Sequence, residues 1–81
     1  MSIRVLFFAS ISDIVGMRET SLDAADFKDV RSIFDKFARE NPSLEAYRAS
    51  MLCALNSEFA RPGSAVHDGD EVAFFPPVSG G

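Results

Sequence analysis

The sequence predicts an α+β domain in which one main helix packs across a single face of a mixed sheet of four to five strands. One segment of about 11 residues repeats its apolar side chains at helical spacing, and five shorter stretches of strand length lie around it, separated by turn residues. Hydrophobic residues make up 47% of the 81 residues and include eight Phe, which is enough for one core. We therefore expect one domain over residues 1–75, followed by a protruding, flexible tail over residues 76–81.

The N-terminal part of the chain predicts two paired strands joined by a short helical turn. Residues 3–9 carry apolar side chains on both faces, as a central strand does. Ser10 begins an S-x-x-D pattern and is the expected N-cap of the turn, and Gly16 ends it in the left-handed conformation that glycine tolerates. Residues 19–22 are more polar, so we expect an edge strand antiparallel to the first.

Residues 30–40 form the main predicted helix. Its apolar side chains recur at i, i+3, i+4, i+7 and i+8 and make one stripe, which indicates a face packed on the core. Asp29 is the expected N-cap, and Pro42 forces the helix to end. On the solvent side we expect three ion pairs at i,i+4 spacing, each worth a few tenths of a kcal/mol: Arg31 with Asp35, Asp35 with Arg39, and Lys36 with Glu40.

The second half of the chain alternates short elements with turn residues. In order, we expect a helical turn over 43–48, a strand over 51–55, a turn at Asn56-Ser57, a short strand over 58–60, a turn at Asp68-Gly69-Asp70 and a last strand over 71–75. Cys53 lies in the middle of an apolar strand, so a buried, unreactive thiol is expected there.

One helix covers only one face of such a sheet, yet the first and last strands carry large apolar side chains on both faces. An uncovered apolar patch of this kind usually marks a protein interface. Phe75 stands where the last strand meets the tail, and Phe59 stands beside a tight turn on a short strand. We expect both rings to be exposed for docking; the alternative is ordinary packing at the edge of the core.

The C-terminal tail is the second candidate site, and the chain ends in Phe74-Phe75-Pro76-Pro77-Val78-Ser79-Gly80-Gly81. Proline cannot donate to a sheet ladder, and two in succession favour a stiff extended conformation, so the tail should leave the fold as a rod. From Pro76 to Gly81 it reaches roughly 20 Å. Gly80 and Gly81 have no Cβ and fit a narrow channel. The tail either places the Gly81 carboxylate inside another protein or is a frayed terminus.

Composition argues against several classes of function. The formal net charge is −4 with no run of Lys or Arg, which argues against nucleic acid and anionic membranes as partners. No apolar run is long enough to span a bilayer, no signal-peptide pattern is seen, and a single cysteine suits a reducing compartment, so we expect a cytoplasmic protein. His67 and Cys53 are the only residues of their types, so we expect no metal site and no self-contained active site.

The remaining chemically interesting group is the carboxylate of Gly81, which is ionised at pH 7. A carboxylate is a poor electrophile and must be activated, for example as an acyl-adenylate, before it can transfer anything. A nucleophile such as sulfide would then convert it to a thiocarboxylate. That chemistry needs a partner that uses ATP, because this chain contains no glycine-rich phosphate loop.

The terminal block, preceded by Asp68-Gly69-Asp70-Glu71-Val72-Ala73, resembles the C-terminus of the small subunits of molybdopterin synthase. The resemblance continues in Val5-Leu6-Phe7-Phe8-Ala9, in Ala54-Leu55-Asn56 and in the total length. It implies a β-grasp, ubiquitin-like fold and the role of a sulfur carrier that is not catalytic alone. It also implies that this chain binds no cofactor itself.

The resemblance further implies partners. A ubiquitin-activating-type adenylyltransferase uses ATP to adenylate Gly81, and a sulfur donor converts the product to a thiocarboxylate. The tail then enters the large subunit, within a heterotetramer of two small and two large subunits. There it gives sulfur to cyclic pyranopterin monophosphate for the molybdenum cofactor. By position, Gly81 bears the sulfur and Phe75 and Phe59 dock, while the threaded tail consists of Pro76, Pro77, Val78, Ser79 and Gly80.

Two alternatives stay open. Carriers of thiamine synthesis or tRNA thiolation end similarly, but they are shorter or lack the Phe-Phe-Pro-Pro block. A ubiquitin-like binding module whose tail is never modified is the other alternative, and a free Gly-Gly ending argues against it.

Overall fold

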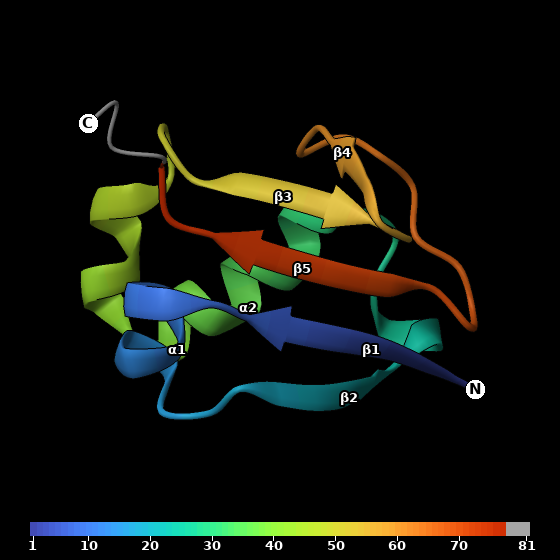
Figure 1. Cartoon of the computed structure of the whole chain (residues 1–81). Helices are drawn as coiled ribbons and strands as arrows, with labels where there is room; N and C mark the ends of the chain where they lie inside the picture. Colours follow the sequence, from blue (N-terminus) through green and yellow to red (C-terminus); the bar gives the residue numbers. More distant parts are fainter. Residues whose placement is uncertain (78–81) are drawn as a thin grey trace.

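The computed structural model describes residues 1–77, so the predictions for Val78, Ser79, Gly80 and Gly81 lie outside the described residues (Figure 1). The elements are β1 (Ser2–Phe7), α1 (Ala9–Val15), β2 (Glu19–Asp23), η1 (Ala24–Asp26), α2 (Val30–Glu40), η2 (Pro42–Tyr47), β3 (Leu52–Leu55), β4 (Glu58–Ala60) and β5 (Glu71–Phe75). Within residues 1–77, no helix has the length and hydrophobicity needed to cross a membrane.

The five strands form one sheet in the order β2-β1-β5-β3-β4. β1 pairs in parallel with β5, and the other neighbours are antiparallel, so the sheet is mixed. α2 lies behind the sheet in Figure 1 and covers one face only. This is the β-grasp arrangement, and the predicted fold class is confirmed. The more polar β2 is an antiparallel edge strand, as its composition predicted.

The core lies between α2 and the covered face of the sheet. Alternation along β1 turns Ile3, Val5 and Phe7 toward the helix, and all three are buried. Phe7 makes an edge-to-face contact with Phe37 of α2, with ring centroids 4.9 Å apart, and a stacked contact with Phe74 of β5 at 6.1 Å. The apolar stripe of α2 is therefore a core face, as predicted.

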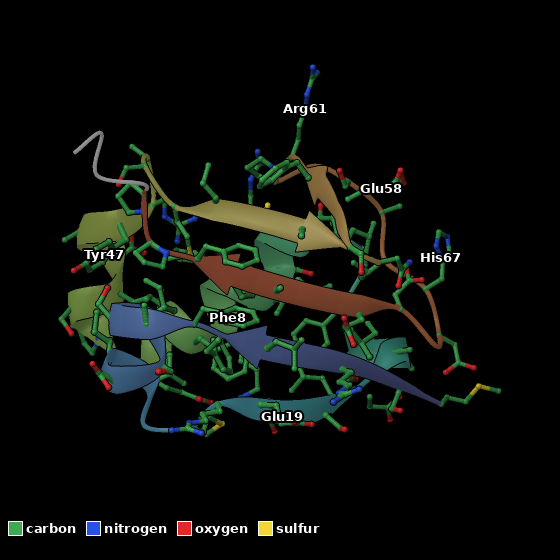
Figure 2. All side chains as sticks on the ribbon, viewed as in Figure 1. Phe8, Glu19, Tyr47, Glu58, Arg61 and His67 are labelled. Atoms are coloured by element: carbon green, nitrogen blue, oxygen red, sulfur yellow. The ribbon has the colours of Figure 1, made fainter. Side chains whose placement is uncertain are left out.

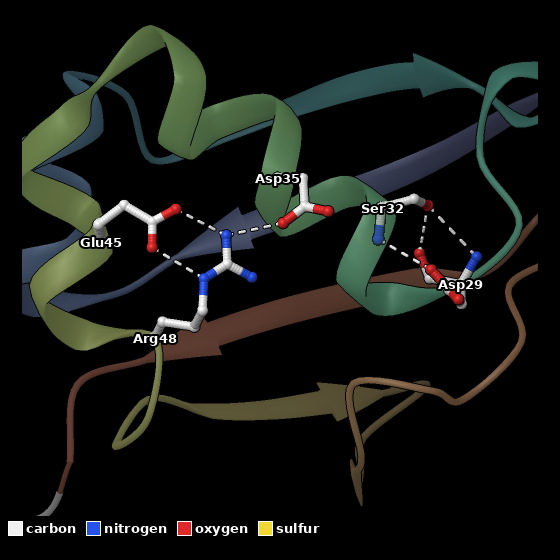
Figure 3. A network of polar contacts seen from close by, with 5 residues as sticks. All are labelled: Asp29, Ser32, Asp35, Glu45 and Arg48. Atoms are coloured by element: carbon white, nitrogen blue, oxygen red, sulfur yellow. Dashed lines mark hydrogen bonds and ion pairs between the residues drawn. The ribbon is translucent and has the colours of Figure 1, made fainter.

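The first turn of α2 is held by a capping box (Figure 3). Ser32 N donates to Asp29 Oδ1 at 2.8 Å, and Asp29 N donates to Ser32 Oγ at 3.3 Å. These bonds satisfy two backbone donors that the first turn leaves without helical partners. The predicted helix bounds and the Asp29 N-cap are confirmed.

The predicted ion pairs of α2 are only partly right. Lys36 and Glu40 pair at 2.6 Å, but Asp35 accepts from Arg48 of the segment after η2 at 2.7 Å (Figure 3). The Arg48 guanidinium also lies over the Phe34 ring, 4.6 Å from its centroid. A residue distant in sequence thus replaced the predicted partners of Asp35, because folding brings η2 against α2.

The prediction that Ser10 caps the short N-terminal helix is wrong. α1 begins at Ala9, Phe8 occupies the N-cap position, and its side chain makes no capping hydrogen bond. The chain leaves β1 earlier than predicted because Phe8 N donates to Phe74 O of β5 at 3.1 Å and Ala9 then turns with φ of 51°. The prediction for Gly16 is confirmed: it ends α1 with φ of 84°.

Candidate functional site: an open apolar face beside the tail

The side of the sheet turned away from α2 carries a cluster of apolar side chains that no helix among residues 1–77 covers. Register places Leu6 of β1 beside Ala73 of β5, Ala73 beside Ala54 of β3, and Ala54 beside Phe59 of β4. Alternation adds two aromatic residues, one after β1 and one at the end of β5. We call this cluster the open face; it consists of Leu6, Phe8, Ala54, Phe59, Ala73 and Phe75.

The open face is hollowed rather than flat. Its centre is a depression of about 220 Å³ that the open-face side chains line together with Ser57 and Glu71. The floor is low because Ala54 and Ala73 have short side chains, while aromatic rings form the walls. Phe59 is 81% exposed and Phe8 is 42% exposed. Large rings this exposed on a small domain indicate a surface that another molecule covers.

The root of the tail is part of this face. The rings of Phe8 and Phe75 are stacked with centroids 4.8 Å apart and an interplanar angle of 8°. β5 ends at Phe75, Pro76 is half-buried and Pro77 is exposed. The described part of the tail therefore begins directly at the rim of the hollow, and the proline pair prevents further ladder bonds there.

Phe75 and Phe59 differ in exposure, although exposed rings were expected for both. Phe59 is confirmed as an exposed aromatic, whereas Phe75 is half-buried because Phe8 covers one side of its ring. Figure 2 shows Phe8 on the side of the sheet that faces the viewer, opposite the helices. Phe8 is thus a member of the site that was not predicted as a site residue, although it alternates with Leu6 along the chain and so falls on the same face.

A row of charged side chains borders the apolar cluster. Arg4 Nε lies 3.2 Å from Glu19 Oε2, and Arg4 Nη1 lies 3.5 Å from Glu71 Oε2. Hydrogen bonding to Glu19 raises the pKa of Arg4 above its ordinary value. Exposed pairs of this kind contribute little stability. Two carboxylates face one guanidinium, so the border has a net negative charge.

The potential metal ligands of the described residues are dispersed, and Cys53, the one thiol, is buried. Within residues 1–77 there is no cluster of three His, Cys, Asp or Glu side chains that could hold a metal ion. Cys53 is buried, its Sγ donates to Ala60 O at 3.2 Å, and burial raises the pKa of its thiol, which agrees with an unreactive side chain.

The fold and the open face together define the class of protein: a β-grasp domain of ubiquitin-like topology that carries an open apolar face. The C-terminal tail begins at the edge of that face.

Comparison with known proteins narrows this class. The model described as ThiS family matches residues 5–81. The molybdopterin synthase sulfur carrier subunit of Escherichia coli (strain K12) is 40% identical over 81 residues, which cover 98% of this chain and 99% of that protein. The crystal structure of SAMP1 from Haloferax volcanii superposes with a TM-score of 0.79 at 31% identity over 100% of both chains.

A further solved structure is a protein–protein complex of subunits 1 and 2 of the molybdopterin-converting factor from Helicobacter pylori 26695. One chain of that complex superposes on this chain with a TM-score of 0.66 at 22% identity, and the match covers 100% of both chains. At this level of identity the similarity concerns the fold alone.

The chain belongs to the ThiS family and, within it, to the molybdopterin synthase sulfur carrier subunits. The family resemblance found in the sequence is confirmed.

Proposed function

We propose that this chain carries sulfur for molybdenum cofactor biosynthesis as a thiocarboxylate on Gly81. The observation that carries the proposal is the 40% identity, over nearly the whole of both chains, with a molybdopterin synthase sulfur carrier subunit. The ThiS family match extends to residue 81 and so includes the Gly-Gly ending. The described residues support the role of a carrier, because they provide a docking surface, and the reactions at Gly81 are then catalysed by partner proteins.

The carrier cycle has three steps at one carbon atom. An oxygen of the Gly81 carboxylate attacks the α-phosphorus of ATP on an adenylyltransferase, and pyrophosphate leaves. A sulfide-level nucleophile attacks the acyl carbon, AMP leaves, and a thiocarboxylate remains. Its sulfur then attacks a carbon of cyclic pyranopterin monophosphate and displaces an oxygen from that carbon, and hydrolysis of the resulting acyl–sulfur bond by water releases the thiolated pterin and restores the carboxylate. ATP is bound by the activating partner, and this chain binds no cofactor in any step.

The open face is the proposed docking surface for both partners. Phe59 and the Phe8–Phe75 stack would be covered on docking, and Pro76 and Pro77 would then direct Val78, Ser79, Gly80 and Gly81 into the partner's active site. The tail begins at the rim of the hollow, so docking places its root within roughly 20 Å of any site that Gly81 must reach. The acidic border formed by Glu19 and Glu71 favours a partner with a basic rim.

The partners proposed are the large subunit of molybdopterin synthase and a ubiquitin-activating-type adenylyltransferase. The complex of subunits 1 and 2 of the molybdopterin-converting factor, one chain of which shares this fold, supports the first partner. We place the carrier in the cytoplasm, in a heterotetramer of two small and two large subunits.

Intact mass spectrometry tests the proposal. The purified chain is incubated with ATP, the adenylyltransferase and a sulfide source, and we expect the mass change of one sulfur replacing one oxygen. A variant that lacks Gly81 serves as the control and should show no change. An unchanged mass of the complete chain, together with normal cofactor synthesis by cells that carry only the shortened variant, would refute the sulfur carrier role.

A second candidate function is attachment to other proteins. SAMP1, a small archaeal modifier protein, is similar over the full length of both chains. An acyl-adenylate at Gly81 would also react with a lysine amine, which would displace AMP and form an isopeptide bond. Higher-mass conjugates in cells, lost when Gly81 is removed, would support this function. Restoration of cofactor synthesis in a strain that lacks its own carrier would support the first.

A further inference from the structure

Two turns that lie far apart in the sequence are joined at the end of the sheet opposite the tail. Asn56 Nδ2 donates to Asp70 Oδ1 at 2.9 Å, and Glu71 N donates to Asn56 Oδ1 at 2.9 Å. The second oxygen of Asp70 accepts from His67 N at 2.8 Å. We call this set of side-chain bonds between Asn56, Asp70, His67 and Glu71 the latch. Figure 2 shows His67 and Glu58 at this end of the molecule.

The latch holds the two-residue turn that joins β3 to β4. Asn56 has φ of 52° and Ser57 has φ of 72°, as in the type I′ turn that suits the twist of paired strands. Asparagine tolerates this left-handed region, whereas serine rarely adopts it. Asn56 is also bonded to Glu71 through its side chain and through its backbone N, which donates to Glu71 O at 2.8 Å, so contacts from β5 fix the turn in place.

The turn forms one wall of the open face. Ser57, Phe59 and Glu71 all line the hollow. Phe59 stands on β4, a three-residue strand at the edge of the sheet that pairs only with β3. The ring is 81% exposed, so its own packing contributes little to its position. The place of the Phe59 ring therefore depends on the turn that precedes it.

We propose that Asn56 and Asp70 are positioning residues for docking: the latch fixes the β3–β4 turn and thereby holds the Phe59 ring at the wall of the hollow before a partner arrives. This inference rests on the proposed role of the open face as the docking surface. Holding a contact residue in its bound position lowers the entropy that is lost on association. Neither side chain needs to touch the partner.

A double-mutant cycle separates positioning from general stability. Asn56→Gly removes the side-chain bonds while glycine still accepts the left-handed conformation. The dissociation constant for the large subunit is measured by calorimetry for the wild-type chain, Asn56→Gly, Phe59→Ala and the double variant. We expect Asn56→Gly to weaken binding about two- to tenfold, which corresponds to the ordering of one side chain. In the Phe59→Ala background the same change should have no further effect.

Asn41→Ala provides the matched control. Asn41 Nδ2 donates to Phe37 O at 3.0 Å at the end of α2, on the covered side of the sheet. Its loss should lower the melting temperature without changing the dissociation constant. The positioning role would be overturned if Asn56→Gly bound the large subunit with wild-type affinity. It would also be overturned if Asn56→Gly weakened binding equally in the wild-type and Phe59→Ala chains. Either result would leave the docking face in place. Wild-type affinity of Phe59→Ala would overturn the docking face and the latch together.

Hydrogen exchange gives a readout that needs no partner. In Asn56→Gly the amides of β4 should exchange faster, while those of β1 and β5 keep their wild-type rates. Unchanged β4 exchange would contradict the latch. If Asn56→Gly does not fold, Asp70→Asn, which keeps the shape and removes the charge of the acceptor, is measured in the same way.

Discussion

Replacement of Phe59 by alanine separates docking from folding more sharply than any other change on the open face. Complete burial of a Phe side chain contributes about 1.5–3 kcal/mol. Because 81% of Phe59 is exposed in this chain, roughly four-fifths of that contribution, about 1.2–2.4 kcal/mol, is available to a partner. Phe59→Ala should therefore weaken binding of the large subunit about 8- to 60-fold. The free energy of unfolding of the Phe59→Ala variant should stay within about 0.5 kcal/mol of the wild-type value.

Two variants provide the comparison. Phe37→Ala removes a ring that is 2% exposed, so it should destabilise the fold by about 3–5 kcal/mol. Met17→Ala removes a side chain that is 41% exposed but lies outside the open face, so it should change neither property. Calorimetric titration gives the dissociation constants, and urea unfolding followed by circular dichroism gives the stabilities.

The reasoning would be wrong on either of two results. A Phe59→Ala variant that binds like the wild type would mean that the ring is not covered on docking. A loss of stability close to that of Phe37→Ala would mean that Phe59 contributes to the core despite its exposure.

Three further predictions concern the cap, the latch and the tail. Asp29→Ala removes the N-cap of α2 and should cost about 1 kcal/mol in urea unfolding; an unchanged midpoint would show that the cap bonds are not needed. Hydrogen bonds from Asn56 and His67 lower the pKa of Asp70. This contribution to stability is therefore complete above the ordinary aspartate pKa of about 3.9 and disappears as pH falls below it. Asp70→Asn should accordingly be less stable than wild type at pH 6, and this difference should shrink as the pH falls through the lowered pKa of Asp70; a difference in stability that does not change with pH would contradict the reasoning. Addition of one residue after Gly81 should abolish adenylation in a pyrophosphate-release assay, and full activity of the extended chain would contradict threading of a free terminus.

Local patterns were enough to predict most of the fold. The apolar spacing over residues 30–40, with Asp29 before it and Pro42 after it, determined α2 to the residue. Short apolar runs bounded by turn residues located the strands within one or two positions. Such features depend on neighbours within one helical turn or on alternation along one strand, so they can be recognised without knowing what lies across the fold. The Ser10 cap failed because β5 holds the backbone at Phe8, which is a contact between distant segments.

The candidate site was only partly predictable. An excess of apolar side chains on two faces of the sheet, with one helix to cover them, indicated the open face and singled out Phe59 and Phe75. The stacking of Phe8 on Phe75 and the latch between Asn56 and Asp70 could not be predicted in the same way. Each joins residues 14 or more positions apart. The two turn motifs were recognised separately, and no feature of either motif indicates that they bond to each other.

From composition and periodicity, the sequence by itself predicted a small domain with one helix packed on a mixed sheet, and its terminal motif carried the resemblance to the sulfur carriers, because these are local properties. The tertiary structure decided which aromatic rings face solvent together, how the open face is hollowed and how its wall at Phe59 is held. These depend on strand register and on side chains that meet only when β1, β3 and β5 lie side by side. Docking is a property of that assembled surface.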